Sequence, residues 1–168
     1  MKNPNDVLFE GFQPYQRVCN LAEKLDLVPV RDPSQSDFER LSEIVNRVLP
    51  KVQSRDENEL PLLGIVLYAA EDQHVESDRQ SLALTVWDEV GAVIGLSVEL
   101  LRLMPGIFAD VVMLHELAHL SIHDHGDRFQ VYSNWLFLQY FSGLCDKNGK
   151  PRFDAADKIL NHFKDWTI

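Results

Sequence analysis

The chain has few cysteines and no long apolar run. Its 168 residues include only Cys19 and Cys145, which show no metal-ligand spacing and which we expect to be free, buried thiols. No segment approaches the ~18 consecutive apolar residues that a membrane helix needs. Residues 1–6 are polar, and no apolar stretch typical of a secretory signal follows them. These absences predict a cytoplasmic location and no membrane partner.

Basic residues are also scarce, because 16 lysines and arginines face 26 aspartates and glutamates, for a net charge of −10. Such a charge repels a phosphate backbone, so nucleic acid is not an expected partner. The hydrophobic content of 45 % and the charged content of 25 % are ordinary for a globular chain. We expect one domain over residues 1–168, with residues 1–13 as a loosely held arm.

The spacing of apolar residues predicts an α+β fold. A buried strand is expected at 62–69 and a hairpin at 81–97, which gives a small, mostly antiparallel sheet packed on several helices. The expected helices cover 15–27, a segment from a capping box at Ser36–Glu39 to before Pro50, a helix beginning at Pro105-Gly106, 127–141 and 153–166.

The segment from His115 to His119 reads HELAH and matches the pattern HExxH. Histidines four apart on a helix lie on one face, where both can reach one tetrahedral metal ion at about 2.0–2.1 Å. Glu116 lies beside that ion and can take a proton from a water bound there. The surrounding apolar pattern predicts a largely buried helix, so these imidazoles need a metal or hydrogen-bond partners. The alternative is a pair of hydrogen-bonded core histidines.

A catalytic zinc usually has three protein ligands, so a third is expected after the helix. If the helix continued, His123 would lie about 12 Å along its axis from His115, out of reach of the metal. The third ligand must therefore follow a bend, and Gly126 can take the left-handed conformation that ends a helix. We predict His125 as the third ligand and Asp127 as its first substitute. His123 is left as a supporting group, a substrate contact or a surface residue.

No glutamate follows Glu116 in the sequence. This absence disfavours the class of HExxH enzymes whose third ligand is a downstream glutamate. An aspartate ligand stays open, but no spacing favours Asp146, Asp154 or Asp157.

The run VMLHELAHL at 112–120, followed by His125, Gly126 and an aromatic residue at Phe129, resembles the SprT/WLM/YgjP-like group of minimal zinc metallopeptidases. The resemblance covers roughly residues 81 to 141. It implies a zincin-like fold with a central HExxH helix, and an edge strand from the hairpin that pairs with an extended substrate. It also implies a site in which Zn²⁺ is held by His115, His119 and His125 and water is activated by Glu116.

Some features depart from related patterns. No CxxC pair is present, so the zinc ribbon of many SprT proteins is missing, and the acidic chain gives no reason to infer a DNA-linked role. Metzincins carry glycine where this chain has Ile122. The ImmA/IrrE-like peptidases also have HELAHL and a histidine near position 123, but their further glutamate ligand has no counterpart here.

The sequence therefore predicts a zinc-dependent peptidase that acts on a peptide or protein substrate. Tyr132 or Arg128 could polarise the substrate carbonyl. Three alternatives stay open: a metal-binding sensor or partner-binding module without peptidase activity, an ImmA/IrrE-like regulatory peptidase, and a domain in which the motif is coincidental.

Overall fold

The computed structural model describes residues 7–52, 59–72, 82–103 and 106–140. The α-helices are α1 (Tyr15–Lys24), α2 (Gln35–Val48), α3 (Val98–Leu103), α4 (Gly106–Ala118) and α5 (Asp127–Tyr140). The strands are β1 (Leu62–Tyr68), β2 (Ala83–Trp87) and β3 (Ala92–Ser97), and short 3₁₀ turns cover Leu49–Lys51 and Ala70–Asp72. The predicted α+β class is confirmed.

The three strands form one sheet in the order β1-β3-β2. β2 and β3 are the predicted hairpin and pair antiparallel, whereas β1 pairs parallel to β3. The expectation of a mostly antiparallel sheet is therefore wrong. After β1 the chain passes to the far edge of the sheet, and the hairpin brings it back through the middle in the direction of β1. Every residue of β3 is buried, as suits a central strand.

The two faces of the sheet are covered by different helices. Gly64 of β1 lies against Val18 of α1, and a Cβ atom at this glycine would collide with the valine side chain. This close approach defines the α1 face. Ile65, Ile94 and Thr85 occupy adjacent register positions on the opposite face, because successive side chains of a strand alternate between faces. That second face carries α4.

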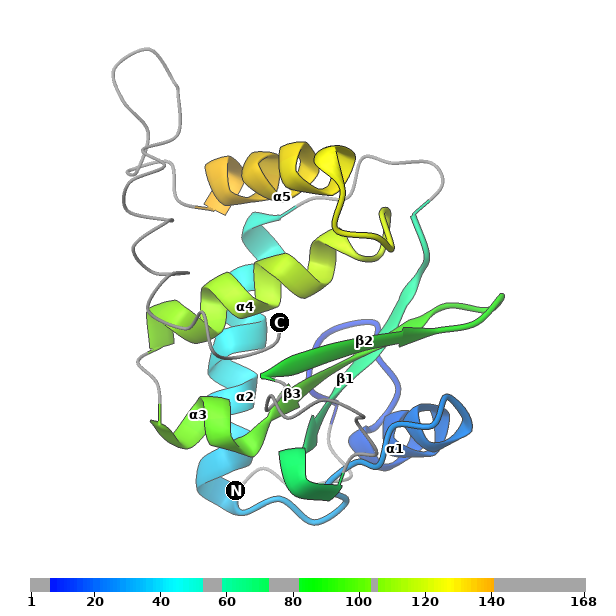
Figure 1. Ribbon diagram of the computed structural model, residues 1–168. Helices are drawn as coiled ribbons and strands as arrows, with labels where there is room; N and C mark the ends of the chain where they lie inside the picture. The colour runs from blue at the N-terminus through cyan, green and yellow to red at the C-terminus, as the bar shows by residue number, and fades with distance from the viewer. Residues whose placement is uncertain (1–6, 53–58, 73–81, 104–105, 141–168) are drawn as a thin grey trace.

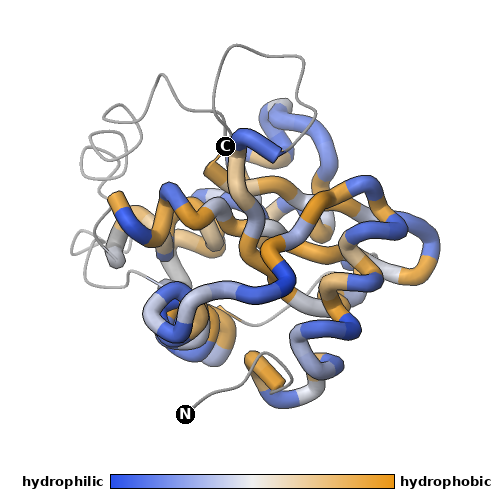
Figure 2. Tube along the Cα trace, turned by 90° about the horizontal axis from the view of Figure 1, so that it is seen from below, coloured by the Kyte–Doolittle hydropathy of each residue, from blue (hydrophilic) through white to orange (hydrophobic). Residues whose placement is uncertain are grey.

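Helix α4 lies between the sheet and α5 (Figure 1). Val112, Met113 and Leu114 are all buried, so three successive residues contact protein on different sides of the helix. A helix that is apolar all round is a buried helix. Figure 2 shows hydrophobic residues gathered mostly in the middle of the fold. The predicted motif helix is thus central.

The N-cap of helix α2 lies two residues before the predicted one. Ser34 is its N-cap, and the Ser34 hydroxyl accepts a hydrogen bond of 3.1 Å from the backbone N–H of Asp37. The prediction of Ser36 as the cap is wrong, because Ser34 and Asp37 offer the same spacing of serine and acid two residues earlier in the chain.

Residues 7–13 are not a loose arm, because Leu8 is buried in the core. Asn46 of α2 donates a side-chain hydrogen bond of 3.3 Å to the Leu8 carbonyl, and Val7 forms an isolated bridge with Pro14. Residues 1–6 lie outside the described residues. The prediction of a loose arm is therefore wrong for residues 7–13.

Cys19 is buried and free, as predicted. The predicted helix at 153–166, Cys145 and the aspartates Asp146, Asp154 and Asp157 lie outside the described residues. Within the described part of the chain, no helix has the length and apolar character needed to cross a membrane.

Candidate metal centre

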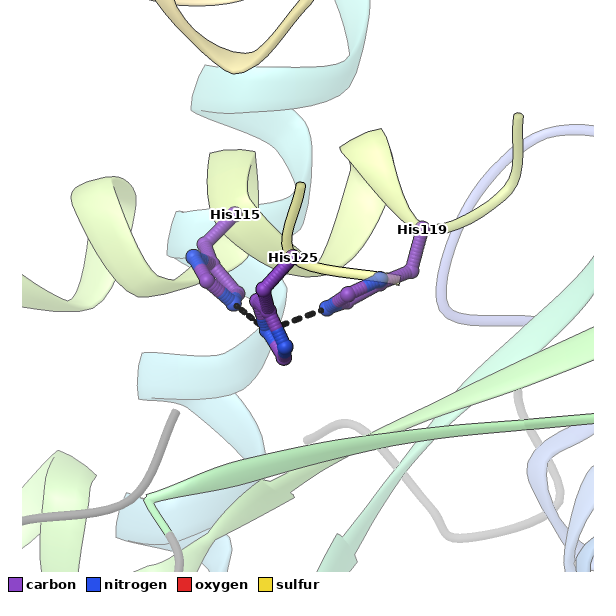
Figure 3. Close-up of side chains that lie close together, drawn as sticks. All are labelled: His115, His119 and His125. Carbon is purple, nitrogen blue, oxygen red and sulfur yellow. Dashed lines mark hydrogen bonds between the residues drawn. The ribbon is translucent and has the colours of Figure 1, made fainter. Parts of the chain in front are cut away.

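Three histidines from two neighbouring segments face one another (Figure 3). His115 lies in the last turn of α4, His119 one residue beyond the helix, and His125 in the loop before α5. The Nε2 atom of His125 lies 3.2 Å from that of His115 and 3.1 Å from that of His119. The three side chains lie close enough to bind one metal ion. The residues predicted as ligands are thus brought together.

The spacing of these nitrogens fits a bound cation. Two nitrogens on one tetrahedral zinc at about 2.0–2.1 Å lie about 3.3 Å apart. The observed separations of 3.1 and 3.2 Å come close to this value. One proton can bridge only one pair of nitrogens, whereas a cation accepts a lone pair from each of the three. The arrangement suits a divalent ion that prefers imidazole.

The chain bends back because α4 ends earlier than the sequence indicated. The backbone N–H of His119 donates to the Glu116 carbonyl over 3.1 Å, and that of Leu120 donates to Leu117 over 3.1 Å. These bonds span three residues and tighten the last turn. Gly126 does not adopt the left-handed conformation, so the prediction that it ends the helix is wrong. The Asp124 carboxylate instead accepts the backbone N–H of Gly126 at 2.8 Å.

His119 is fixed by a second hydrogen bond. Its Nδ1 atom lies 3.0 Å from the Ile122 carbonyl. Because a carbonyl only accepts, Nδ1 carries the proton and donates, which leaves the lone pair on Nε2. Burial lowers the pKa of His119, so its neutral form is favoured. A neutral imidazole with Nε2 free of its proton is the form that binds metals.

Phe129 of α5 packs against all three rings. Its ring centroid lies 4.8 Å from His115, 4.5 Å from His119 and 5.0 Å from His125. Phe129 itself is buried. A rigid apolar ring in this place limits how the imidazoles can rotate, so α5 helps to hold the ligand geometry.

Glu116 is buried beside the cluster, with 2 % of its surface exposed. Burial raises the pKa of Glu116 to about 7, and a hydrogen bond from Thr85 opposes that rise. The Thr85 hydroxyl on β2 donates to the Glu116 carboxylate. Edge strand β2 therefore reaches the HExxH segment through a side chain that the sequence did not single out.

His123 and Asp127, the alternatives to His125, do not belong to the cluster found among the described residues. His123 stacks on Trp87 of β2, with ring centroids 4.2 Å apart and planes inclined by 24°. Asp127 is the first residue of α5. Tyr132, expected to polarise a carbonyl, stacks on Trp135 at 5.6 Å and lines a cavity with Leu117 and Leu136. Its role toward a substrate stays a prediction.

The sequence reasoning missed two residues on β2, Thr85 and Trp87. A signal for both was present, because Leu82, Leu84 and Val86 alternate with them and so assign them to a common face. The sequence did not indicate that this face of β2 is turned toward α4.

We compared the chain with protein-family models, with curated proteins and with solved structures, and none of the three comparisons gave a match. The functional argument therefore depends on the residues and their geometry.

Proposed function

We propose that the chain is a zinc-dependent peptidase, in which His115, His119 and His125 hold Zn²⁺ and Glu116 is the general base. The observation that carries the proposal is the convergence of the three histidines, with the buried Glu116 as the residue that follows His115. The resemblance to the SprT/WLM/YgjP-like metallopeptidases favours the same residues. Three ligands leave a coordination position for water, as in catalytic rather than structural zinc sites.

When bound, zinc supplies Lewis-acid chemistry: it polarises a carbonyl and lowers the pKa of a water toward about 7. His115, His119 and His125 need to be neutral for this, and burial favours that form at His119. His125 is exposed, so the cluster borders solvent and a substrate can approach it from that side.

Glu116 would take a proton from the attacking water and give it to the leaving amine. A general base works best when its pKa is near the working pH, and burial brings the pKa of Glu116 to about 7. The cation would lower this value, and the hydroxyl of Thr85 favours the ionised form in the same direction. Thr85 also fixes the orientation of the carboxylate.

An extended substrate would pair with the outer edge of β2. This edge pairs with no other strand among the described residues. Ser97 donates its backbone N–H to the Leu82 carbonyl at 3.0 Å, and hydrogen-bonded pairs alternate along an antiparallel ladder. The alternation directs the backbone groups of Thr85 and Trp87 outward, where a substrate strand can bond to them. β2 is thus the edge strand of the hairpin.

The direct test compares wild type with Glu116→Gln, both loaded with zinc, on unfolded casein. Loss of a general base typically costs 10²- to 10⁴-fold, so we expect cleavage to fall by about that factor while zinc content stays unchanged. A matched control is Glu99→Gln, which changes a half-buried glutamate of α3. This control should cleave like wild type.

A wild type that cleaves nothing after incubation with zinc would contradict the peptidase proposal. If such a protein still held one zinc per chain, the evidence would favour the alternative of a metal-binding sensor or partner-binding module. If it held no zinc, the motif would be coincidental.

A further inference from the structure

An aromatic pair forms one rim of the candidate metal centre. Trp87 is the last residue of β2, and His123 lies two residues before the ligand His125. Their rings are stacked at 4.2 Å. Even so, 43 % of the Trp87 surface is exposed. A tryptophan stacked against a neighbour but left open to solvent is a preformed contact surface.

A second exposed apolar residue lies close to Trp87 in the chain. Val90, at the tip of the same hairpin, is 69 % exposed. The nearest carboxylate in the sequence, that of Asp88, accepts the backbone N–H groups of Val90 at 2.8 Å and Gly91 at 3.2 Å. Asp88 therefore serves the turn. A flat aromatic side chain can stack on the exposed part of the Trp87 ring and extend the ring pair.

The register of β2 connects this surface with the metal centre. Thr85 and Trp87 share a face of the strand, and Thr85 is hydrogen-bonded to Glu116. On a substrate strand paired with β2, the residue opposite Trp87 lies two positions, or about 6.8 Å, from the residue opposite Thr85. Both residues direct their side chains toward α4. The side chain of the residue opposite Trp87 therefore contacts the Trp87 ring.

We propose that Trp87 and His123 form a specificity subsite that selects an aromatic side chain, two residues along the substrate from the residue that pairs with Thr85. This inference rests on the proposed peptidase function and names its substrate class: extended, unfolded peptide segments that carry phenylalanine, tyrosine or tryptophan at one fixed distance from the cleaved bond.

Binding tests the subsite without any cleavage. The probe is a set of labelled ten-residue peptides of threonine, serine and valine, in which one phenylalanine, alanine or lysine is moved along the chain. Affinities are measured with the zinc-loaded Glu116→Gln protein. One position should favour phenylalanine over alanine by about three- to tenfold, the range given by an aromatic pair.

Variants in the same Glu116→Gln background assign that preference. Trp87→Ala and His123→Ala should remove it, and Trp87→Phe should keep part of it. Val86→Ala is the matched control, because Val86 lies on the opposite face of the same strand. It should keep the full preference. No preference at any position, a preference for lysine, or a preference that persists in Trp87→Ala would each overturn the subsite.

The two proposals fail in different ways. If wild type leaves casein intact while the phenylalanine preference is present and depends on Trp87, the peptidase proposal fails and the surface is a peptide-binding site. If wild type cleaves casein but the mass-mapped cut sites show no aromatic residue at a fixed position, the subsite fails and the peptidase proposal stands.

Discussion

Asp110 near the start of α4 and His115 near its end are polar residues on the same apolar helix, but they meet different neighbours. Asp110 is buried and accepts two hydrogen bonds from Arg47, at 2.7 and 2.8 Å, and one of 2.5 Å from the hydroxyl of Tyr140. His115 instead faces two groups of its own kind, His119 and His125.

We interpret this difference as one between a residue that stabilises the fold, Asp110, and a residue that serves the proposed metal site, His115. Burying a charge costs free energy unless an opposite charge and hydrogen bonds compensate for it, and Asp110 has both. Arg47 in turn joins α2 to α4. Burial, together with the nearby carboxylate, raises the pKa of the Tyr140 hydroxyl to about 12. The three histidines instead bring their Nε2 atoms together. We propose that a bound cation compensates for burying this cluster.

The largest expected effect sharpens the functional side of this comparison. His125→Ala removes one of three ligands, and since even outer-shell partners of a metal contribute 10- to 100-fold in affinity, we expect zinc affinity to fall by more than about 100-fold. Casein cleavage should be lost with it. Affinity is measured by competition with a chromogenic chelator. The matched control is His123→Ala, which removes a nearby histidine outside the cluster and should bind zinc like wild type.

The structural side is tested by Arg47→Ala. This change leaves Asp110 buried with Tyr140 as a remaining donor, and we expect the free energy of unfolding to fall by about 2–3 kcal/mol. Arg47 is 38 % exposed, so the loss should stay below that of a fully buried pair. Urea unfolding of the metal-free protein measures it. Zinc affinity should not change. A large loss of zinc affinity in this variant would mean that zinc binding at one end of α4 depends on the Arg47–Asp110 pair at the other end.

A smaller effect is expected at the link between β2 and the general base. Thr85→Val keeps the shape but removes the hydrogen bond to Glu116, and bonds to charged groups contribute about 1.5–3 kcal/mol. We expect kcat on casein or a derived peptide to fall by roughly ten- to a hundredfold, with unchanged zinc content. Thr85→Ser keeps the hydroxyl and should keep most of the activity. Equal loss in both variants would argue against the hydrogen bond.

The smallest effect concerns the pair of Arg102 on α3 and Asp37 on α2. The Arg102 guanidinium, 2.6 Å from the carboxylate, holds the pKa of Asp37 below its usual value. Its contribution is present above the unfolded pKa near 4 and is lost as pH falls through the lower folded pKa. Because the Arg102 side chain is 58 % exposed, solvent screens the pair and we expect the smallest loss of stability here.

Urea unfolding at several pH values measures this pair. Arg102→Gln should be less stable than wild type at pH 7, and the gap should narrow below about pH 4. A gap that is constant with pH would show that the arginine acts through packing and not through charge.

The metal centre could be predicted from the sequence where its signal is local. The spacing of His115 and His119 follows from helix geometry, and His125 was identified because chain beyond the helix had to bend back to the ion. The exact bend was not predictable: α4 ends at Ala118, and Gly126 keeps a conformation open to other residues. Backbone bonds of the last turn decide this, and many sequences can form them.

Long-range pairing was harder to predict than local structure. The hairpin was expected from alternating side chains and a turn, but the parallel pairing of β1 with β3 depends on which strand occupies the middle of the sheet. Alternation also assigned Thr85 and Trp87 to one face without saying what covers it. Packing against α4 supplies that information, and no local pattern contains it.

Metal analysis of gently purified protein tests the central claim most directly. Wild type and His123→Ala should each carry about one zinc per chain, and His125→Ala should carry almost none. Fewer than about 0.2 zinc per chain in wild type, unchanged after dialysis against dilute zinc, would contradict the account.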